Sequence, residues 1–564
     1  MAYSKPSDPK ERMKMEFQIS KDFLEHKENT KHDLNQRING VPNKGGSSGK
    51  QLAGYVTLEQ FYRGDQWDHD EPLGASQRSD NYCAVIVDNL SSLIFDDAPE
   101  INCPTDDPTD EVLELKAEMK EKMIWRVWQD NDYEVEFDEW SKQGSAYGDG
   151  FLKGPWAEKV NKNGKVVSPN DSGTWRFRFT HIENPATIRL IFADSGYRNL
   201  LGFIQSDRIP HSKALTLYGD LAKKKGIKIE PSINSDPAVT TLETNSQIPM
   251  VNIDEFWTDE IMGIFINDKL LDFYIHDWGF VPLQYVKNGY IPNYPYGKSD
   301  LEDVLDPQVS HNRSNADLAN LLKWISSINM WGKNVEGMNA LVSGLSRIYS
   351  LPEDGELHAF EKTGDPYITN TYVAQRRSAI VEISGVSEAL LSSSQLSVSS
   401  GKALALAFQG TMRKLNPRAR RYRVALEHLN ENILKLDEKY YPQTERIING
   451  DYRNEVFLPT TLLRNIVDTI NKFQSGIISQ DTAMREAGVA QPNMEKKMMK
   501  KDLMDPVLGP QVARQPALLP RLSEGENAPG ESPMAAPGNA PTAGQAGAVA
   551  NINNSASGGA ATPK

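Results

Sequence analysis

The sequence predicts an α+β fold that is mainly helical, with flexible segments at both ends of the chain. Three observations lead to this prediction. Residues 51–298 mix helix-like and strand-like patterns, residues 299–505 have mostly helical periodicity, and the two ends have compositions typical of disorder. A chain of 564 residues is too long for one ordinary core, so we expect roughly two to four structural units.

The chain is acidic, with 62 Lys and Arg residues against 76 Asp and Glu residues, a formal net charge of −14. Proteins that grip duplex DNA need a basic face, so contact with nucleic acid is expected to be loose or confined to local basic segments. Cys83 and Cys103 are too few for a disulfide framework or a cysteine-rich metal site, and they favour a reducing compartment. The sequence contains neither a secretory signal nor a long apolar run, so we expect cytoplasmic synthesis and no membrane partner.

Both ends of the chain are predicted to be flexible. Residues 1–50 are expected to form an N-terminal arm with one short helix around Glu11 to Glu28, before a Gly/Ser/Asn-rich stretch. Residues 506–564 are rich in Pro, Ala and Gly and nearly lack aromatic side chains. Such a segment cannot bury enough apolar surface to offset the entropy lost on ordering, so we expect a disordered tail.

Residues 51–298 are predicted to form an α+β domain. Val112 to Val127 should be a helix, with an apolar stripe formed by Val112, Leu113, Leu115, Met119, Met123 and Val127. Strand-like runs occur at Trp175–Thr180, Ile253–Trp257, Ile261–Ile266 and Leu270–His276. The last two runs are typical of a hairpin with Asn267 and Asp268 at its turn.

Residues 299–505 are predicted to be mainly helical. The first helix begins with a capping-box pattern at Ser299–Glu302 and runs to about Ile328, with Pro307 either bending it or lying in its first turns. Glycine and proline then interrupt residues 329–368. The remaining predicted helices are Thr369–Leu391, Gly401–Tyr440, Thr460–Ser475 and Gln480–Gly488. The helix at 401–440 has Pro417 as a kink and an apolar seam formed by Tyr422, Leu426, Leu429, Ile433, Leu436 and Tyr440.

The motif search favours a protein that is not an enzyme. Neither Gly49-Lys50 nor Gly401-Lys402 has the upstream glycine of a phosphate-binding loop. The acidic run Asp68–Glu71 could hold a divalent metal, but a solvated acidic turn is the favoured interpretation. A second acidic cluster, Asp106–Glu111, leads into a helix, where carboxylates stabilise the helix N-terminus. We therefore expect no catalytic residue, no cofactor and no metal.

Two segments are candidate contact sites. A basic cluster lies in the middle of the 401–440 helix and consists of Arg413, Lys414, Arg418, Arg420, Arg421 and Arg423. It could contact DNA phosphate or an acidic neighbour in an oligomer, although a solvated helix face is the favoured alternative. A small uncharged loop joins two long helices and consists of Ser392, Ser393, Ser394, Gln395, Leu396, Ser397, Val398, Ser399 and Ser400. It suits a segment that moves past another surface without sticking, and an ordinary connector ending in a serine N-cap is an equal alternative.

The order of these parts resembles portal proteins of tailed bacteriophages, the head–tail connectors with a wing, stem, clip and crown. The segments that carry the resemblance are Leu58–Asp65, Asn81–Leu93, Gly297–Glu302 followed by Asn312 and Ser314–Leu318, Ile383–Ser387 with Ser400–Leu404, and, more weakly, Gly476–Ser479 with Thr482 and Ala483. The resemblance spans about 55–490, and it leaves the N-terminal arm and the Pro/Ala/Gly-rich tail unexplained.

The resemblance implies a role for each segment. The expected parts are an α+β wing at 51–298, a first stem helix at 299–328, a clip at 329–368, a second stem helix at 369–391, a DNA-facing tunnel loop at 392–400, a long wing helix at 401–440 and a crown at 441–505.

The same resemblance implies a ring, typically of twelve subunits, at one capsid vertex of the virion, assembled in the host cytoplasm. The implied partners are other copies of the chain, double-stranded DNA in the channel, terminase, major capsid and scaffolding proteins, and head–tail adaptor proteins. Closure of a ring needs head-to-tail interfaces between different faces of the subunit, which long amphipathic helices can provide. Another ring-forming or scaffolding virion protein and a nucleic-acid enzyme are the alternatives.

Overall fold

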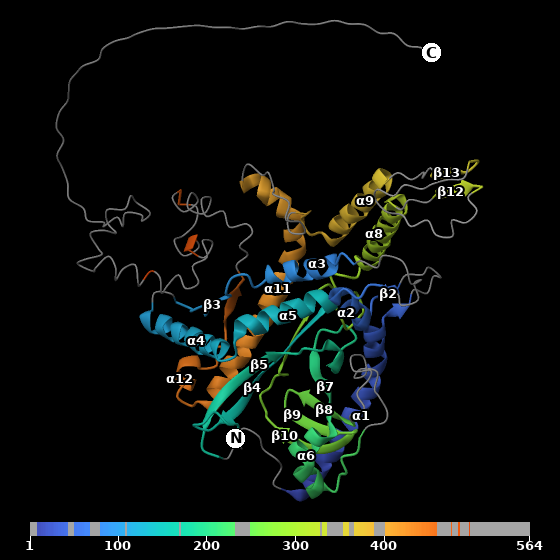
Figure 1. Ribbon diagram of the computed structural model, residues 1–564. Helices are drawn as coiled ribbons and strands as arrows, with labels where there is room; N and C mark the ends of the chain where they lie inside the picture. The colour runs from blue at the N-terminus through green and yellow to red at the C-terminus, as the bar shows by residue number, and fades with distance from the viewer. Residues whose placement is uncertain are drawn as a thin grey trace, which may run out of the picture. The chain divides into compact units, whose positions relative to one another are not determined.

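The computed structural model describes residues 8–42, 50–67, 79–107, 110–167, 171–231, 249–326, 330–334, 353–359, 366–388 and 401–458, with isolated positions at 475–476, 483–484 and 496. The chain divides into two units, residues 1–499 and 500–564, and the described residues all belong to the first. They form a mixture of helices and sheets, which confirms the α+β prediction (Figure 1). None of the described helices combines the length and apolar character needed to cross a membrane.

The helices are α1 (Pro9–Asn39), α2 (Tyr55–Arg63), α3 (Tyr82–Ser92), α4 (Glu111–Gln129), α5 (Tyr133–Tyr147), α6 (His211–Lys225), α8 (Leu305–Ser326), α9 (Pro366–Ser384), α11 (Gly401–Tyr440) and α12 (Glu445–Ile448). The strands are β1 (Val41–Pro42), β2 (Lys50–Leu52), β3 (Glu100–Asn102), β4 (Asp149–Val160), β5 (Thr174–His181), β6 (Ile188–Phe192), β7 (Leu200–Pro210), β8 (Met250–Thr258), β9 (Ile261–Ile266), β10 (Lys269–Ile275), β11 (Leu283–Lys287), β12 (Met330–Lys333), β13 (Glu356–Ala359) and β14 (Glu455–Phe457).

A five-stranded antiparallel sheet, in the order β10-β9-β8-β7-β6, has a helix on each face. Successive side chains of a strand point to opposite faces, so β8 directs Phe256 to a cluster with α1 and directs Val251 and Ile253 to a cluster with α6. The ring of Phe23 on α1 stacks on Phe265 with 3.7 Å between centroids. Asn267 at the β9–β10 turn has positive φ, as does the next residue, which confirms the predicted hairpin turn.

The largest core lies around a second antiparallel sheet, in the order β11-β4-β5, which packs against α5 and α11. Figure 1 shows β4 and β5 as a long ribbon beside these helices. The predicted seam of α11 faces this core, where Tyr422 makes edge-to-face contact with Trp140 at 4.8 Å. The prediction of a helix from Gly401 to Tyr440 with a buried seam is therefore confirmed, and Pro417 lies inside it.

The prediction of a flexible arm at residues 1–50 is wrong for the part that forms α1. The helix has 31 residues, begins at an Asp8 N-cap and buries Ile19, Phe23 and Leu34. These apolar positions are separated by polar and charged residues, so the composition of the segment hides the face that packs on the sheet.

The helix predicted at 112–127 is confirmed as α4, but its predicted apolar stripe is right only in its second half, where Met123 and Val127 pack against the core. Val112, Leu115 and Met119 are exposed. The buried residues of the helix are Val127 of the predicted stripe and four that were not predicted, Ala117, Lys120, Ile124 and Trp128. Lys120 can be buried because its ammonium group reaches Asp451 at 3.0 Å, which supplies the partner a buried charge needs.

The two predicted helices around residues 329–368 are shorter than expected. Helix α8 begins at Leu305, after a separate turn, so Pro307 lies in its first turn and does not bend it. Helix α9 ends at Ser384, because Gly385 adopts a left-handed backbone with φ of 67° and terminates it. The two helices contact each other, and the segment that joins them includes the hairpin of β12 and β13.

Several predictions fall outside the described residues. These are the serine-rich loop 392–400, the acidic run Asp68–Glu71, the predicted helices Thr460–Ser475 and Gln480–Gly488 apart from isolated positions, and the tail 506–564. The described start of the 441–505 segment is not separate from the first half of the chain, because β14 pairs with β3.

The packing of α1 generates a first prediction. Phe23→Ala should lower the free energy of unfolding by about 3–5 kcal/mol, because it removes a buried ring that stacks on the sheet. Phe17→Ala on the exposed side of the same helix should change it by less than about 0.5 kcal/mol. Denaturant titration of the purified chain, with each variant compared at the same protein concentration, measures both, and equal losses would mean that α1 does not pack as described.

Candidate functional site

Two residues of the predicted basic cluster point inward. Lys414 Nζ lies 3.0 Å from one oxygen of Asp300, and Arg418 Nη1 lies 2.7 Å from the other. Ser145 donates its hydroxyl to the same carboxylate at 2.8 Å. Burial raises the pKa of Asp300, but the two cations and the hydroxyl outweigh it, so the pKa lies below its ordinary value. These contacts stabilise the carboxylate and fasten α11 to the turn before α8.

The other four residues of the cluster have different surroundings. Arg421 donates to the backbone carbonyl of Asn288, and Arg423 pairs with a glutamate one turn along the helix at 3.5 Å. Arg413 and Arg420 are exposed. The structure therefore does not bring the six residues together as one surface, since α11 directs them to different sides.

Lys414 also reaches the end of α9. Its ammonium group donates to the carbonyl of Ser384 at 2.9 Å, in the last turn of that helix. A cation is favourable there because the carbonyl end of a helix carries partial negative charge. Thr411, one turn earlier on α11, accepts from the backbone N–H of Ser387 at 2.9 Å. One face of α11 thus holds both the entry to α8 and the exit from α9.

A second buried carboxylate, Asp149, lies at the start of β4. Arg37 pairs with it at 3.0 Å, and both side chains are fully buried. Tyr55 and Tyr285 each donate a hydroxyl to it at 2.7 Å, and the backbone N–H of Gly297 donates at 2.6 Å. Four donors from four separate segments therefore converge on one carboxylate.

The turn at 297–302 fits against the end of α5 only because Gly148 lacks a side chain. Gly148 has φ of 88°, and a Cβ there would lie 2.6 Å from the backbone nitrogen of Ser299. Ser299 accepts from the N–H of Leu301 at 3.0 Å and donates to the carbonyl of Ala146 at 2.6 Å. The predicted capping residue is thus used to anchor the turn, while Glu302 contacts Arg37 at 3.4 Å.

A buried amide network ties α8 to the segment between α2 and α3. Asn312 donates to Gln66 at 2.6 Å, and Gln66 donates to Asn81 at 2.9 Å. Gln308, one turn earlier on α8, donates to the carbonyl of Asp80 at 2.5 Å. Asn81 and Asn312 belong to two different segments that carry the sequence resemblance, and the structure brings them together through a glutamine that sequence reasoning did not single out.

Residues 50–177 match the family described as phage portal protein, SPP1 Gp6-like. The resemblance to phage portal proteins is confirmed. A search of curated proteins finds no match to the chain. The portal family is a family of structural proteins of the phage particle. The matched segment runs from β2 into β5. It includes Tyr55, Gln66, Asn81, Ser145 and Asp149, which take part in the networks around Asp149, Asp300 and Asn312 described above.

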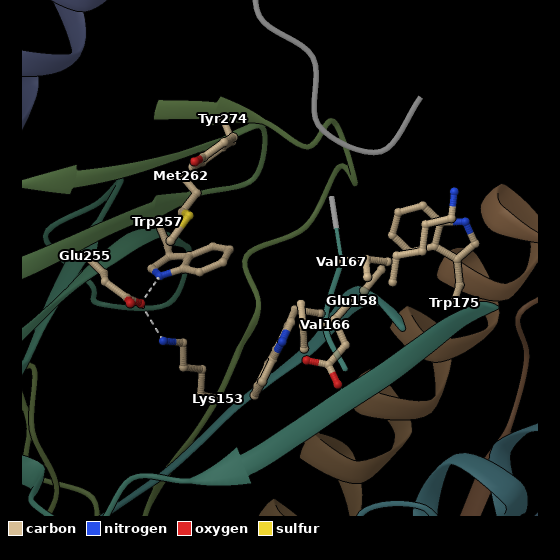
Figure 2. A pocket seen from close by; sticks show the side chains of 12 residues that line it. Lys153, Glu158, Val166, Val167, Trp175, Glu255, Trp257, Met262 and Tyr274 are labelled. Atoms are coloured by element: carbon tan, nitrogen blue, oxygen red, sulfur yellow. Dashed lines mark hydrogen bonds and ion pairs between the residues drawn. The ribbon is translucent and has the colours of Figure 1, made fainter. Parts of the chain in front are cut away.

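A cavity of about 450 Å³ lies between the two sheets. Figure 2 shows Glu255 between Lys153 and Trp257, with Trp175 on another side of the cavity. Glu255 pairs with Lys153 at 2.6 Å and accepts from the Trp257 indole at 3.0 Å. Lys153 also lies over the Trp257 ring at 5.3 Å, and Lys159 lies over Trp175 at 5.4 Å. The ammonium groups of Lys153 and Lys159 therefore lie over the indole rings of Trp257 and Trp175, and the contacts of Lys153 connect the two sheets.

Among the residues that the structure describes, we searched for groups of side chains that could bind a metal ion or react as nucleophiles. No group of three or more His, Cys, Asp or Glu residues there could hold a metal ion. Cys83 and Cys103 are free and buried, and burial raises the pKa of each thiol to about 12. Asp110 accepts from the N–H of Val112 at 2.9 Å, so this member of the second acidic cluster caps α4 as expected.

The Asp300 site yields a second prediction. Asp300→Asn should lower the free energy of unfolding by about 3–5 kcal/mol, because it leaves Arg418 and Lys414 without their buried anion. Asp303→Asn is the matched control, since this exposed carboxylate of the same turn pairs only with Lys298, and it should cost less than about 1 kcal/mol. Denaturant titration at neutral pH measures both, and similar losses would contradict the assigned role.

The lowered pKa of Asp300 also predicts a pH dependence. The unfolded carboxyl titrates near its ordinary value of 3.8 and the folded one below it, so its contribution to stability is present above about pH 4. That contribution is lost as the pH falls through the lower, folded pKa. Stability measured against pH should therefore fall less steeply on acidification in Asp300→Asn than in the unchanged chain, and parallel curves would contradict the assignment.

Proposed function

We propose that the chain is a phage portal subunit that forms a ring at one capsid vertex and provides the channel for DNA packaging and ejection. The observation that carries the proposal is the connection between the portal-family segment and the helix pair α8–α9. Gln66 and Ser145 lie in that segment, where they bind Asn312 on α8 and Asp300 in the turn before it. Asn81, in the same segment, accepts a hydrogen bond from Gln66.

We assign the parts of a portal subunit to the elements of the chain as follows. In our proposal α8 and α9 belong to the stem helices at 299–328 and 369–391, residues 329–368 form the clip, and residues 392–400 form the tunnel loop. Helix α11 and residues 51–298 form the wing, and residues 441–505 form the crown. Support comes from the contact of α8 with α9, from the β12–β13 hairpin between them in sequence, and from the packing of α11 against β4 and β11.

The charge of the chain suits a channel that DNA passes through. Many contacts between basic side chains and DNA phosphates would bind the duplex tightly to the channel. Each neutralised phosphate adds binding free energy, and this contribution falls as the salt concentration rises. The chain is acidic overall, and two residues of its basic cluster, Lys414 and Arg418, are bound to Asp300. We propose that DNA slides through the ring, and that terminase, capsid, scaffolding and head–tail adaptor proteins bind its outer surfaces.

The direct test is microscopy of the purified full-length chain. Negative-stain images and mass measurement should give closed rings with a central hole, with twelve subunits as the expected number. Neither ATP hydrolysis nor magnesium-dependent DNA cleavage should copurify with the rings. A compact monomer under all conditions, or nuclease activity of the chain itself, would contradict the proposal.

The tunnel-loop assignment has its own test. Gln395→Lys combined with Ser397→Lys should reduce the yield of DNA-filled heads at least tenfold while ring assembly is unchanged, because added cations would hold the passing phosphates. Gln395→Asn combined with Ser397→Thr is the matched uncharged control and should package normally. Normal packaging by the lysine variant would place the loop away from DNA.

A further inference from the structure

The outer side of helix α5 carries an acidic surface. Asp138 and Glu139 are exposed there, and Val135, about one turn earlier, is 59% exposed. Burial raises the pKa of Asp138, and repulsion from Glu139 and from Asp88 on α3 raises it further, against the opposing effect of Lys142. Lys142 itself pairs with Asp88 at 3.0 Å. The three carboxylates therefore lie close together, and the surface carries more negative charge than its lysine neutralises.

A pocket of about 190 Å³ lies beside these carboxylates. Its walls include Tyr62 and Tyr147 and two glutamates, Glu139 and Glu183. Neither glutamate side chain forms an ion pair within the part of the chain that the structure describes. Lys142 also lines the pocket, with its charge already paired. Arginine both stacks on aromatic rings and pairs with carboxylates, so the pocket has the lining that a guanidinium group needs.

His181, which also lines the pocket, shows the sign of the charge there. Its hydrogen bond to Glu136, at 2.8 Å, raises the pKa of the imidazole, and the charges of Glu139 and Glu183 raise it further against the effect of burial. The surroundings of the pocket therefore favour a positive charge. We call Val135, Asp138, Glu139, Glu183 and this pocket the acidic face.

The first part of α11 has the opposite charge. From residue 401 to residue 426 the helix contains basic residues and no acidic one. Arg413 and Arg420 are exposed and lie two turns apart on one side of the helix, and neither forms an ion pair with another described residue. Arg423, further along, is already paired with Glu427. We call the exposed residues Arg413, Asn416, Pro417 and Arg420 the basic face.

The acidic face and the basic face lie on opposite outer sides of the contact between α5 and α11. At that contact Tyr422 of α11 packs against Trp140 of α5, with 4.8 Å between the ring centroids. Arg420 and Asp138 each lie two positions before these aromatic residues, which is about 200° around a helix of roughly 3.6 residues per turn. The two faces therefore point away from each other, so they cannot pair within one subunit. Each face is left for a different copy of the chain.

We propose that the acidic face of one subunit binds the basic face of α11 in the next subunit of the ring, with an arginine of α11 in the pocket. The occupant is therefore a second copy of this chain. This inference rests on the proposed ring, and it adds which surfaces meet. Two unlike faces on opposite sides of a chain give a head-to-tail contact, which closes a ring when the rotation is right. Opposite charges orient the contact and oppose the pairing of either face with itself.

Duplex DNA is the other anionic partner that exposed arginines bind. The observations favour a second copy, because two arginines on one helix neutralise few phosphates, whereas the pocket on the acidic face has both the rings and the carboxylates that an arginine anchor needs. The experiments below separate the two partners.

Charge reversal tests the proposed contact. Arg413→Glu with Arg420→Glu should lower the fraction of chain in rings by roughly tenfold or more, measured by mass photometry at fixed concentration, because like charges then meet across the contact. Asp138→Lys with Glu139→Lys should do the same. Combining all four changes should restore rings, which a folding defect in either helix would not allow. Lys162→Glu with Lys165→Glu, in an exposed turn between β4 and β5, is the matched control and should leave rings unchanged.

Cross-linking gives an independent readout. Val135→Cys in one preparation and Asn416→Cys in another, mixed before assembly and treated with a short bismaleimide, should give a covalent dimer that neither variant gives alone. The two natural thiols are buried and should react little. Absence of the mixed dimer from rings that do form would contradict the assigned faces.

The outcomes distinguish this inference from the proposed function. If the unchanged chain forms rings but the reversals do not disrupt them, or the combination fails to restore them, the assigned faces are wrong. If the arginine variant forms rings normally but packages less DNA, the arginines bind DNA and the inference is wrong. If the unchanged chain never forms rings, the proposed function itself fails.

Discussion

The described structure depends on burying two carboxylates, Asp149 and Asp300, without leaving either charge unpaired. Removing a carboxylate from water costs several kcal/mol unless cations and hydrogen-bond donors replace the lost hydration. Asp149 takes its donors from α1, α2, β11 and the 297–302 turn, and Asp300 takes its donors from α5 and α11. Neither charge is satisfied until segments far apart in the sequence are all in place. The two residues therefore specify how these elements assemble.

The need to pair the buried charge of Asp300 also connects the helices α8 and α9 to α5 and α11. Asp300 lies in the turn before α8, and Lys414 binds both Asp300 and the last turn of α9. The amide network through Gln66 fixes α8 again, two turns later. In the proposed portal ring, this arrangement would hold α8 and α9 at a fixed angle to α5 and α11.

Much of the fold was predictable from local patterns. The α11 seam, the hairpin at Asn267 and the capped start of α4 follow from periodicity and turn chemistry, and the structure confirms them. The burial of α1 was not predictable from composition, since Phe23 and Arg37 stand in a charged segment and their partners, Phe265 and Asp149, are remote in the sequence. The spacing of Ile19, Phe23, Leu34 and Ile38 was the available signal. The first half of the predicted α4 stripe is exposed, because apolar spacing along a helix does not by itself say which side meets the core.

The candidate site was predicted less well than the fold. The six basic residues of α11 are neighbours in sequence, but periodicity does not say which of them meets a remote carboxylate. Asp300 was identified only as part of a motif, and Gln66 not at all, since a lone polar residue becomes a network member only through tertiary contacts. The portal-type parts assigned to residues 299–505 remain a proposal. The segment that matches the portal family, residues 50–177, supports this proposal but does not include those parts.

The coupling between Asp300 and Arg418 is the most direct test of the central constraint. A double-mutant cycle with Asp300→Asn, Arg418→Met and the combined variant compares free energies of unfolding under identical conditions. The account predicts that the two changes are strongly non-additive, with a coupling of about 1–3 kcal/mol, because each single change strands the other charge in the interior. Additive effects within about 0.3 kcal/mol would show that the two side chains do not depend on each other, and would contradict the account.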